Sequence, residues 1–375
     1  MTTATSQSAT RMTSLTYTVR FVTPAFLGNA EQQGQWRTPP FKALLRQWWR
    51  VAAAKDHGYN HERLREAEGK LFGNAWIENN FCKSKVRLRL DGWDEGKLSS
   101  NGWPGGSIEK VVTTRDGKGQ VSADVYMGYG PVLPPSKKDN RSKITIRNTI
   151  GPTEPTMQLR VGYERSLETD MAATLQLIQW FGALGSRSRN SWGSLLLEPI
   201  ENASALPILP QIDHPLISQI GRSWRECFKE EWPHALGTEA GKPLIWITEP
   251  KLDWRTVMGC LANIKVEVRQ SAKTIRGPSG IGGIYLLGYP AGGKWEIHKL
   301  GKEARLASQL RFKVVRDTQD RLRGMVFHLP CRFPGKLSSH LEREQKDWIE
   351  DNEQKIWEKI HRQLNTSRRL KPLFD

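Results

Sequence analysis

Residues 21–50, FVTPAFLGNAEQQGQWRTPPFKALLRQWWR, constrain the fold more than any other stretch of this chain. A strand that ends near Thr23-Pro24 is followed by a turn with Gly28 and Asn29. Thr38-Pro39 then offers an N-cap and a proline at the first helical position. The stretch therefore predicts a strand, a loop and a helix. One face of that helix is apolar and belongs to a core, because the helical period brings together Phe41, Leu44, Leu45, Trp48 and Ala52.

The other side of the predicted helix is cationic. Lys42, Arg46 and Arg50 share this side, and Trp49 lies at its edge. Cations repeated along one face beside an aromatic ring suit a polyanion whose bases can stack. An ordinary solvated helix surface is the alternative interpretation.

Charge points to the same class of partner. The 375 residues include 56 Lys and Arg against 39 Asp and Glu, a net charge of +17. The excess is spread over both halves, and a sequence pI near 9.8 favours nucleic acid or an anionic membrane surface as partner. No stretch approaches the roughly 18 apolar residues of a spanning helix, and the N-terminus lacks the apolar region of a signal peptide. We expect a cytoplasmic protein that does not bind membranes.

Cysteine and histidine spacing gives no metal site. Cys82, Cys227, Cys260 and Cys331 stand far apart, which argues against a zinc ribbon or a disulfide framework and fits a reducing compartment. His57 and His61 have helical i, i+4 spacing, but Gly58 and Asn60 favour a loop with surface histidines. Motifs of zinc deaminases, two-metal enzymes and serine hydrolases are absent from the sequence. We expect no metal and no cofactor.

A second basic feature is the segment KSKVRLRL, residues 83–90. Its alternation predicts a strand with a wholly basic face made of Lys83, Lys85, Arg87 and Arg89. Like charges along one face repel one another, so an anionic ligand or an acidic neighbour is the favoured explanation.

Two glycine-rich segments follow. Gly182–Ser194 holds Arg187, Arg189, Asn190 and Trp192. Glycines allow close backbone approach to phosphates, arginines bind them, and an indole can stack on a base; a helix C-cap followed by a tight turn is the alternative. The run GPSGIGG at 277–283 lacks the Gly-Lys-Ser/Thr of a P-loop and is expected to be a turn or a loop with backbone contacts.

The segmentation predicts two domains. Residues 1–14 are Ser/Thr-rich and expected to be mobile, and residues 15–204 form the first domain. Residues 91–155, rich in Gly, Pro, Lys, Asp and Asn, are expected to be an insertion of loops with a hairpin or two. Proline-rich residues 205–216 mark the boundary, and residues 205–375 form the second domain, ending in a helix from Ser339 to about Leu364 with Ser339 and Glu342 at capping-box spacing.

The motifs TPAFLGNA, RTPPFKALLRQWWR and EAEGKLFG resemble the opening of the RAMP superfamily of CRISPR proteins, and within it the first-subunit family of type III-B (Cmr) effector complexes. The loop FGALGSRSRNSWGS and the segment Arg305 to Ser308 before LRFKVV are similar to the same family. Gly28-Asn29 stands where the family often has two glycines, and Gln309 where a proline is usual.

The resemblance implies an α+β chain with two ferredoxin-like (RRM-like, βαββαβ) RAMP domains in tandem. In the first half this order fits strand 15–22, helix 38–55, strand 83–90, strand 156–163, helix 169–184 and strand 194–198. It further implies a non-catalytic subunit that contacts other RAMP subunits, holds the 3′ end of the guide RNA (crRNA) and helps to capture target RNA in antiviral defence. By motif position, the RNA-binding residues would be Asn29, Arg37, Lys42, Arg46, Trp49, Arg50, Arg187, Arg189, Asn190 and Trp192, with Arg276 and Arg305 in the second half.

Two other functions stay open at this point. One is a metal-independent endoribonuclease that trims guide precursors, with Tyr59, His57 or His61 as general acid or base. The other is a free-standing, non-specific single-strand binder.

Overall fold

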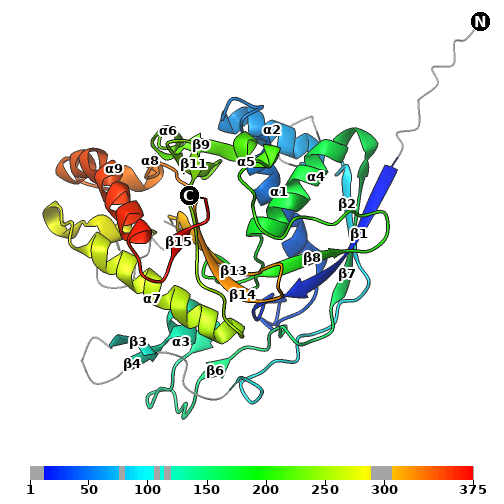
Figure 1. Ribbon diagram of the computed structural model, residues 1–375, viewed down its shortest axis with the longest axis horizontal. Coiled ribbons are helices and arrows are strands. Elements are labelled where there is room, and N and C mark those ends of the chain that lie inside the picture. The colour runs from blue at the N-terminus through cyan, green and yellow to red at the C-terminus, as the bar shows by residue number, and fades with distance from the viewer. Residues whose placement is uncertain (1–11, 76–80, 105–109, 114–119, 289–305, 375) are drawn as a thin grey trace, which may run out of the picture.

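The computed structural model describes residues 12–75, 81–104, 110–113, 120–288 and 306–374. It combines helices with mainly antiparallel sheets, so the chain belongs to the α+β class, as the sequence predicts (Figure 1). Among the described residues, no helix is long and apolar enough to cross a bilayer.

The first half builds a four-stranded antiparallel sheet in the order β2-β7-β1-β8. Two long helices connect its strands, so that the chain runs strand, helix, strand, strand, helix, strand. The elements are β1 (Met12–Phe21), α1 (Thr38–Ala53), β2 (Val86–Leu90), β7 (Met157–Glu164), α4 (Glu168–Phe181) and β8 (Leu195–Pro199). Residue burial alternates along β7, because one face of the sheet packs on the helices. The sequence predicted all six elements at these places.

The second half repeats this order of connections. Its antiparallel sheet has the order β13-β14-β12-β15, and two helices of 20 and 23 residues join its strands. The elements are β12 (Ile245–Ile247), α7 (Trp254–Lys273), β13 (Leu310–Arg316), β14 (Leu322–His328), α9 (Arg343–Asn365) and β15 (Lys371–Pro372).

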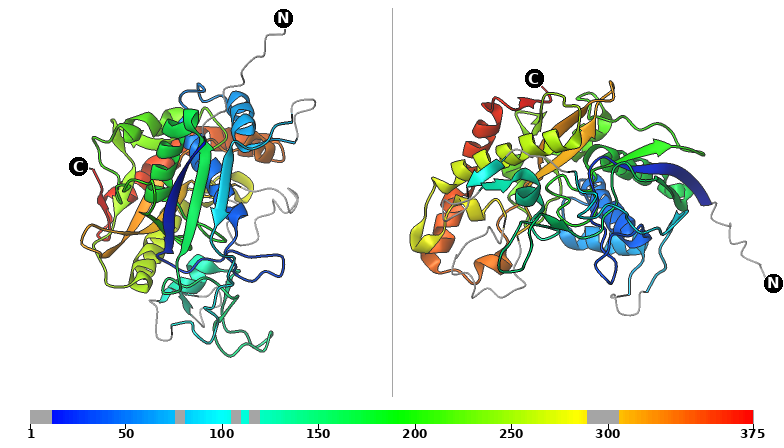
Figure 2. Two further views of the ribbon diagram at one scale, coloured as in Figure 1. Left: turned by 90° about the vertical axis from the view of Figure 1, so that its right-hand side faces the viewer. Right: turned by 90° about the horizontal axis from the view of Figure 1, so that it is seen from below.

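The two sheets and four helices form alternating layers. Helices α1 and α4 lie between the sheets, and α7 and α9 cover the far side of the second sheet (Figures 1 and 2). Successive residues of the second sheet therefore enter different cores: Met325 and Phe327 face α1 and α4, whereas Val326 faces α7 and α9. The second sheet is buried on both faces, so β13 is buried from Leu310 to Val315 without alternation.

The core between the sheets is continuous across the two halves. Trp48 of α1 lies 5.4 Å from Phe181 of α4 and 6.3 Å from Phe327 of β14, measured between ring centroids. Phe181 and Phe327 are 4.8 Å apart. The proline-rich segment 205–216 thus connects two sheets that share one core.

Residues 91–155 contain two hairpins and a short helix in their described parts. These elements are β3 (Lys110–Thr113), β4 (Gln120–Ser122), α3 (Ala123–Gly128), β5 (Val132–Leu133) and β6 (Thr145–Ile146). Val125 and Met127 are buried in the core that α7 also enters, so α3 packs on the second half.

The remaining described elements are shorter. They are α2 (His61–Phe72), α5 (Pro215–Ile220), β9 (Gly221–Ser223), α6 (Trp224–Cys227), β10 (Leu236–Glu239), β11 (Lys242–Pro243), α8 (Gly335–Ser338) and the 3-10 turns Arg165–Leu167, Pro278–Gly280 and Gly283–Tyr285. The turn Pro278–Gly280 lies in the predicted glycine loop 277–283, and Gly283–Tyr285 begins at its last residue.

Several predicted boundaries were wrong. Helix α1 begins at Thr38 itself, and its N-cap position is Arg37 without a side-chain cap. The C-terminal helix has its capping box at Glu342 and Gln345 rather than at Ser339. Residues 1–11 lie outside the described part of the chain, but Met12 to Ser14 belong to β1 and are not a loose terminus.

Candidate nucleic-acid interface

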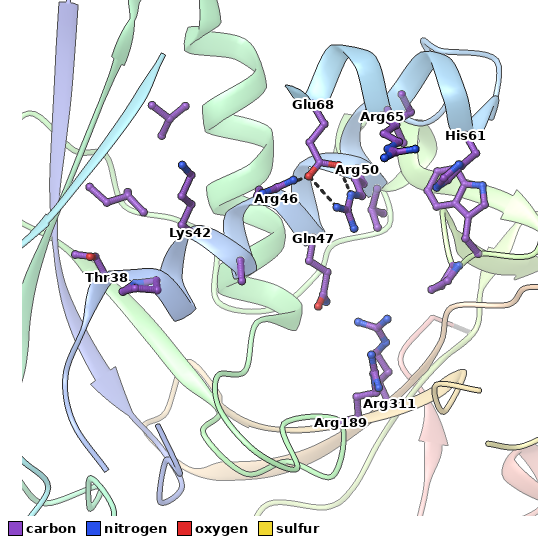
Figure 3. Close-up of a pocket in the computed structure, with 18 residues that line it drawn as sticks. Thr38, Lys42, Arg46, Gln47, Arg50, His61, Arg65, Glu68, Arg189 and Arg311 are labelled. Atoms are coloured by element: carbon purple, nitrogen blue, oxygen red, sulfur yellow. Dashed lines mark hydrogen bonds and ion pairs between the residues drawn. The ribbon is translucent and has the colours of Figure 1, made fainter. Parts of the chain in front are cut away.

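A cleft of about 930 Å³ opens between α1, α2 and the edge of the second sheet (Figure 3). Six Lys and Arg side chains and one carboxylate line this cleft. The cations are Lys42, Arg46, Arg50, Arg65, Arg189 and Arg311, and the carboxylate is Glu68. The cleft is therefore strongly positive, as expected for a surface that binds phosphates.

The cationic side of α1 forms one wall of the cleft. Arg46 and Arg50 both bind Glu68 of α2 through their Nε atoms, and Arg50 Nη2 donates a second hydrogen bond of 2.8 Å. Glu68 is only 2% exposed. Burial opposes its ionisation, but the hydrogen bonds and charges of Arg50 and Arg46 outweigh burial and lower the pKa of the Glu68 carboxyl. Two arginines share one negative charge, so this wall keeps a net positive charge.

Arg189 and Arg311 form the opposite wall (Figure 3). They come from different halves of the chain and meet because the glycine-rich loop pairs with the edge of β13. The backbone N–H of Phe312 donates to the Arg189 carbonyl at 3.0 Å, and Asn190 and Phe312 form a parallel bridge. The loop predicted from its glycines and arginines is thus positioned by the second sheet.

Arg311 is a buried cation without a carboxylate partner among the described residues. Its side chain is on the face of β13 toward α1, with Cζ 5.9 Å from the Trp48 ring, and the residue is 6% exposed. Its Nε makes no hydrogen bond within the described structure. Burial, and then the charge of Arg189, lower the pKa of Arg311 to about 9. A guanidinium held in this way is costly unless an anion binds it.

Neither predicted stacking tryptophan is available to a base. Trp49 is 3% exposed and donates from Nε1 to Asp170 of α4 at 3.2 Å. Trp192 is fully buried among Phe26, Trp103 and Trp254 at centroid distances of 5.2, 5.7 and 5.8 Å. Both predictions of stacking were wrong, because each indole fills a core.

The basic strand also lies apart from the cleft. Lys83, Lys85, Arg87 and Arg89 are exposed, but Arg87 and Arg89 are on the face of the first sheet that no described helix covers (Figure 2). It is Val86 and Leu88, on the other face, that line the cleft. Alternation separates the two sets, so the cations of this strand do not join those of α1.

The face of the first sheet that carries Arg87 and Arg89, its outer face, has further charged contacts. Lys85 pairs with Glu164 at 3.1 Å, and Arg89 lies opposite Arg160 in the register of β2 and β7.

The other predicted site residues have varied surroundings. Asn29 holds its own turn, because its Oδ1 accepts from the Gln33 N–H at 2.9 Å. Arg37 is half-buried before α1, and Arg276 is exposed outside the cleft beside the 277–283 turn. Arg305 lies outside the described residues. Arg187 and Asn190 line a neighbouring pocket rather than the cleft.

Sequence reasoning missed Arg311 and Arg65. A signal for Arg311 existed, because Arg311 and Lys313 of the strand LRFKVVR occupy positions that share one face. Lys313 is fully buried, and its Nζ donates to the carbonyls of Ile178 and Gln179, at 3.4 and 2.6 Å, near the C-terminus of α4. One cation of the pair thus stabilises a helix end, and the other points into the cleft.

The residues proposed for acid–base catalysis are dispersed. His61 lines the cleft, 5.7 Å from Trp232. His57 packs at 6.1 Å from Trp49, and burial raises the pKa of Tyr59, whose ring lies 4.0 Å from the Arg222 guanidinium. The described residues contain no group of three His, Cys, Asp or Glu that could hold a metal ion.

No protein-family model matches the chain, and no curated protein matches it. Among solved structures, the chain is similar to Cmr1 from Pyrococcus furiosus in the apo form, with 14% identity and a TM-score of 0.44, over 91% of this chain and 97% of that one. It is also similar to a chain of the Type III-B Cmr-beta complex bound to cognate target RNA and AMPPnP in the presence of ssDNA, with 15% identity and a TM-score of 0.42, over 85% and 94% of the two chains. A third similar chain belongs to Cmr-beta bound to cognate target RNA, with 12% identity and a TM-score of 0.42, over 84% and 94%.

Proposed function

We propose that this chain is a non-catalytic, RNA-binding structural subunit of a type III-B (Cmr) CRISPR effector complex, which holds the 3′ end of the guide RNA and contributes to the capture of target RNA. The observation that carries the RNA-binding part is the pair Arg189 and Arg311 on one wall of the cleft. Arg311 is buried without a carboxylate partner in the described structure, and it faces a wall of α1 that is itself positive.

The chemistry of the cleft favours a phosphodiester backbone over other anions. Guanidinium groups bind phosphate oxygens with two parallel hydrogen bonds, and cations on both walls can contact successive phosphates of one strand. Because the two predicted indoles are buried, base stacking is not the main source of affinity. Binding should therefore depend strongly on salt and little on sequence.

The assembly part of the proposal rests on the sequence motifs that resemble the Cmr first-subunit family. We infer that each half is a ferredoxin-like domain, since both sheets join their strands through the same strand, helix, strand, strand, helix, strand order. Two of the similar solved structures are Cmr-beta complexes bound to cognate target RNA, and RNA of that kind is the ligand we propose here. Purified with the other Cmr subunits, the chain should enter their complex, whereas a free-standing binder would remain a monomer.

Paired variants test the cleft. Arg189→Ala/Arg311→Met should weaken binding of single-stranded RNA by about tenfold or more and reduce the slope of log affinity against log salt by about 2. Arg87→Ala/Arg89→Ala removes the same charge from the outer face of the first sheet and serves as the matched control. Equal losses in both variants, or an unchanged slope in the cleft variant, would contradict the assignment.

The absence of catalysis is tested separately. A transcript that contains the CRISPR repeat, incubated with the purified protein in EDTA, should remain intact. Discrete products that disappear in His61→Ala would instead favour the endoribonuclease, because His61 is the candidate acid or base on the cleft.

A further inference from the structure

A second pocket, of about 850 Å³, lies on the other side of the glycine-rich loop. Its walls are the loop itself, the C-terminal half of α7, and the residues on either side of the segment 289–305, namely Leu287 with Gly288 and Leu306 to Leu310. The proposed function makes no use of this pocket so far.

Cations converge on the polar side of this pocket, and no Asp or Glu lines it among the described residues. The cations are Arg187, Arg189, Lys265 and Arg269. Lys265 Nζ donates to Asn190 Oδ1 at 2.9 Å and lies 5.5 Å from the ring of Tyr126. Burial, and then the charges of Arg269 and Arg187, lower the pKa of Lys265 to about 7. Arg187, Arg189 and Lys265 bring positive charge to one side of this pocket, which favours an anionic ligand there.

The other side of the pocket is apolar. Leu287, Leu306 and Leu310 line it together with Val268 of α7. A pocket that offers cations on one side and aliphatic surface on the other matches a nucleotide, which has a charged phosphate and a flat, weakly hydrated base.

The second pocket and the cleft share Arg189 as a lining residue. A small pocket between them is lined by Gln47 and Arg311 from the cleft side and by Ser188 and Phe312 from the other, and Arg189 lines all three. The glycine-rich loop is therefore a ridge with a positive pocket on each side, and one strand could cross it.

We propose that the second pocket binds a further nucleotide of the single-stranded RNA that occupies the cleft, with its phosphate at Arg187, Lys265 and Arg269 and its base against Leu287, Leu306 and Leu310. The strand crosses the loop at Ser188 to Asn190. This inference rests on the proposed function, because it extends the same RNA beyond the cleft.

The length of the bound RNA provides the test. Oligouridylates of about 4 and about 12 residues span short and long sites on single-strand binders. The longer oligomer should bind the unmodified protein about tenfold more tightly. In Lys265→Met/Arg269→Ala this gain should vanish while the affinity for the short oligomer stays within about twofold. The control Lys273→Ala/Lys355→Ala removes the same charge from exposed positions and should keep the gain.

Ala307→Trp fills the pocket without removing charge, and it should also abolish the gain in affinity. This variant keeps the test valid even where Lys265→Met/Arg269→Ala does not fold. A gain that persists in both variants would overturn the second pocket and leave the cleft assignment standing. If neither oligomer binds the unmodified protein, the proposed function fails instead. Titration with uridine monophosphate then decides the pocket: binding that is lost in Lys265→Met/Arg269→Ala supports it as a nucleotide site, and no binding overturns it.

Discussion

At the scale of single residues, Arg311 shows how binding can oppose stability. Its guanidinium is buried beside another arginine, and no carboxylate among the described residues neutralises it. An isolated buried charge destabilises the folded state, so the position is poor for folding and suited to binding an anion. Lys313, two residues later on the same face, is fully buried but bonded to backbone carbonyls.

Arg311→Met should therefore have two opposite effects. The free energy of unfolding should rise by about 1 kcal/mol or more, because an apolar side chain replaces an unpaired buried cation. RNA affinity should fall about tenfold, because a charge-assisted contact is lost. Urea unfolding and RNA titration measure the two quantities.

Lys313→Met is the matched control on the same strand. It leaves the carbonyls of Ile178 and Gln179 without their donor, so it should lower stability by about 1–3 kcal/mol without changing RNA affinity. An Arg311→Met protein that loses stability and keeps its RNA affinity would contradict this account.

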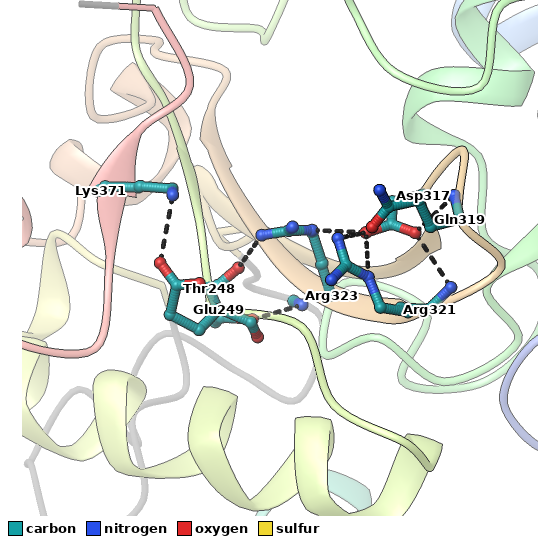
Figure 4. Close-up of polar contacts among 8 residues, drawn as sticks. Thr248, Glu249, Asp317, Gln319, Arg321, Arg323 and Lys371 are labelled. Carbon is teal, nitrogen blue, oxygen red and sulfur yellow. Dashed lines mark hydrogen bonds and ion pairs between the residues drawn. The ribbon is translucent and has the colours of Figure 1, made fainter.

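At the scale of elements, the turn between β13 and β14 is held by one carboxylate (Figure 4). Asp317 Oδ1 accepts from the backbone N–H groups of Gln319 and Arg321, both at 3.0 Å, and Oδ2 accepts from Arg323 Nε at 2.9 Å. Arg323 also donates to the Thr248 carbonyl at 3.1 Å, next to β12. The hairpin that presents Arg311 is thus fixed to its neighbouring strand.

Asp317→Asn should lower the free energy of unfolding by about 2 kcal/mol at neutral pH. Burial opposes ionisation, but hydrogen bonds from the Arg321 N–H and from the Arg323 and Arg321 side chains lower the pKa of Asp317 to about 2. Since this pKa is below the ordinary aspartate value of 3.8, the contribution is complete above about pH 4 and is lost as the pH falls through 2. Denaturant titrations at several pH values should show the gap between the two proteins closing over that range.

Asp320→Asn is the control within the same turn. Its side chain is 77% exposed and pairs only with Arg316 among the described contacts, so its loss should change stability by less than about 1 kcal/mol. A gap between Asp317→Asn and the unmodified protein that does not depend on pH would refute the assigned role of the Asp317 charge.

At the scale of the whole molecule, the two sheets are joined by the helices between them. Trp48, Phe181 and Phe327 bring α1, α4 and β14 into one core, and the glycine-rich loop pairs with β13. The cleft lies along this junction, so its two walls keep their spacing only if both halves are folded.

Phe327→Ala should destabilise the entire chain, by about 3–5 kcal/mol, in a single transition. The side chain is 1% exposed and contacts rings from the first half. Far-UV circular dichroism and tryptophan fluorescence should give coincident unfolding curves in the variant. Two separated transitions, with the first half unaffected, would show that the halves fold independently.

Local sequence patterns were enough to predict several elements and the chemistry of several surfaces. Helix α1 was predicted with its apolar face and its cationic side, because side-chain period and charge are local properties of a helix. The strand–helix order of the first half and the Arg-bearing glycine loop followed from similar local patterns.

Which surfaces meet depends on the packing of the elements in three dimensions. Period alone shows that Arg87 and Arg89 share a face, but the packing of α1 on the opposite face of that sheet excludes them from the cleft. Trp49 and Trp192 are core residues because neighbouring elements cover them, and these contacts cannot be inferred from composition. Arg189 and Arg311 are 122 positions apart in the numbering, and they meet because a loop hydrogen-bonds to a strand edge of the other half. Long-range contacts of this kind depend on how whole layers pack, which no local pattern encodes.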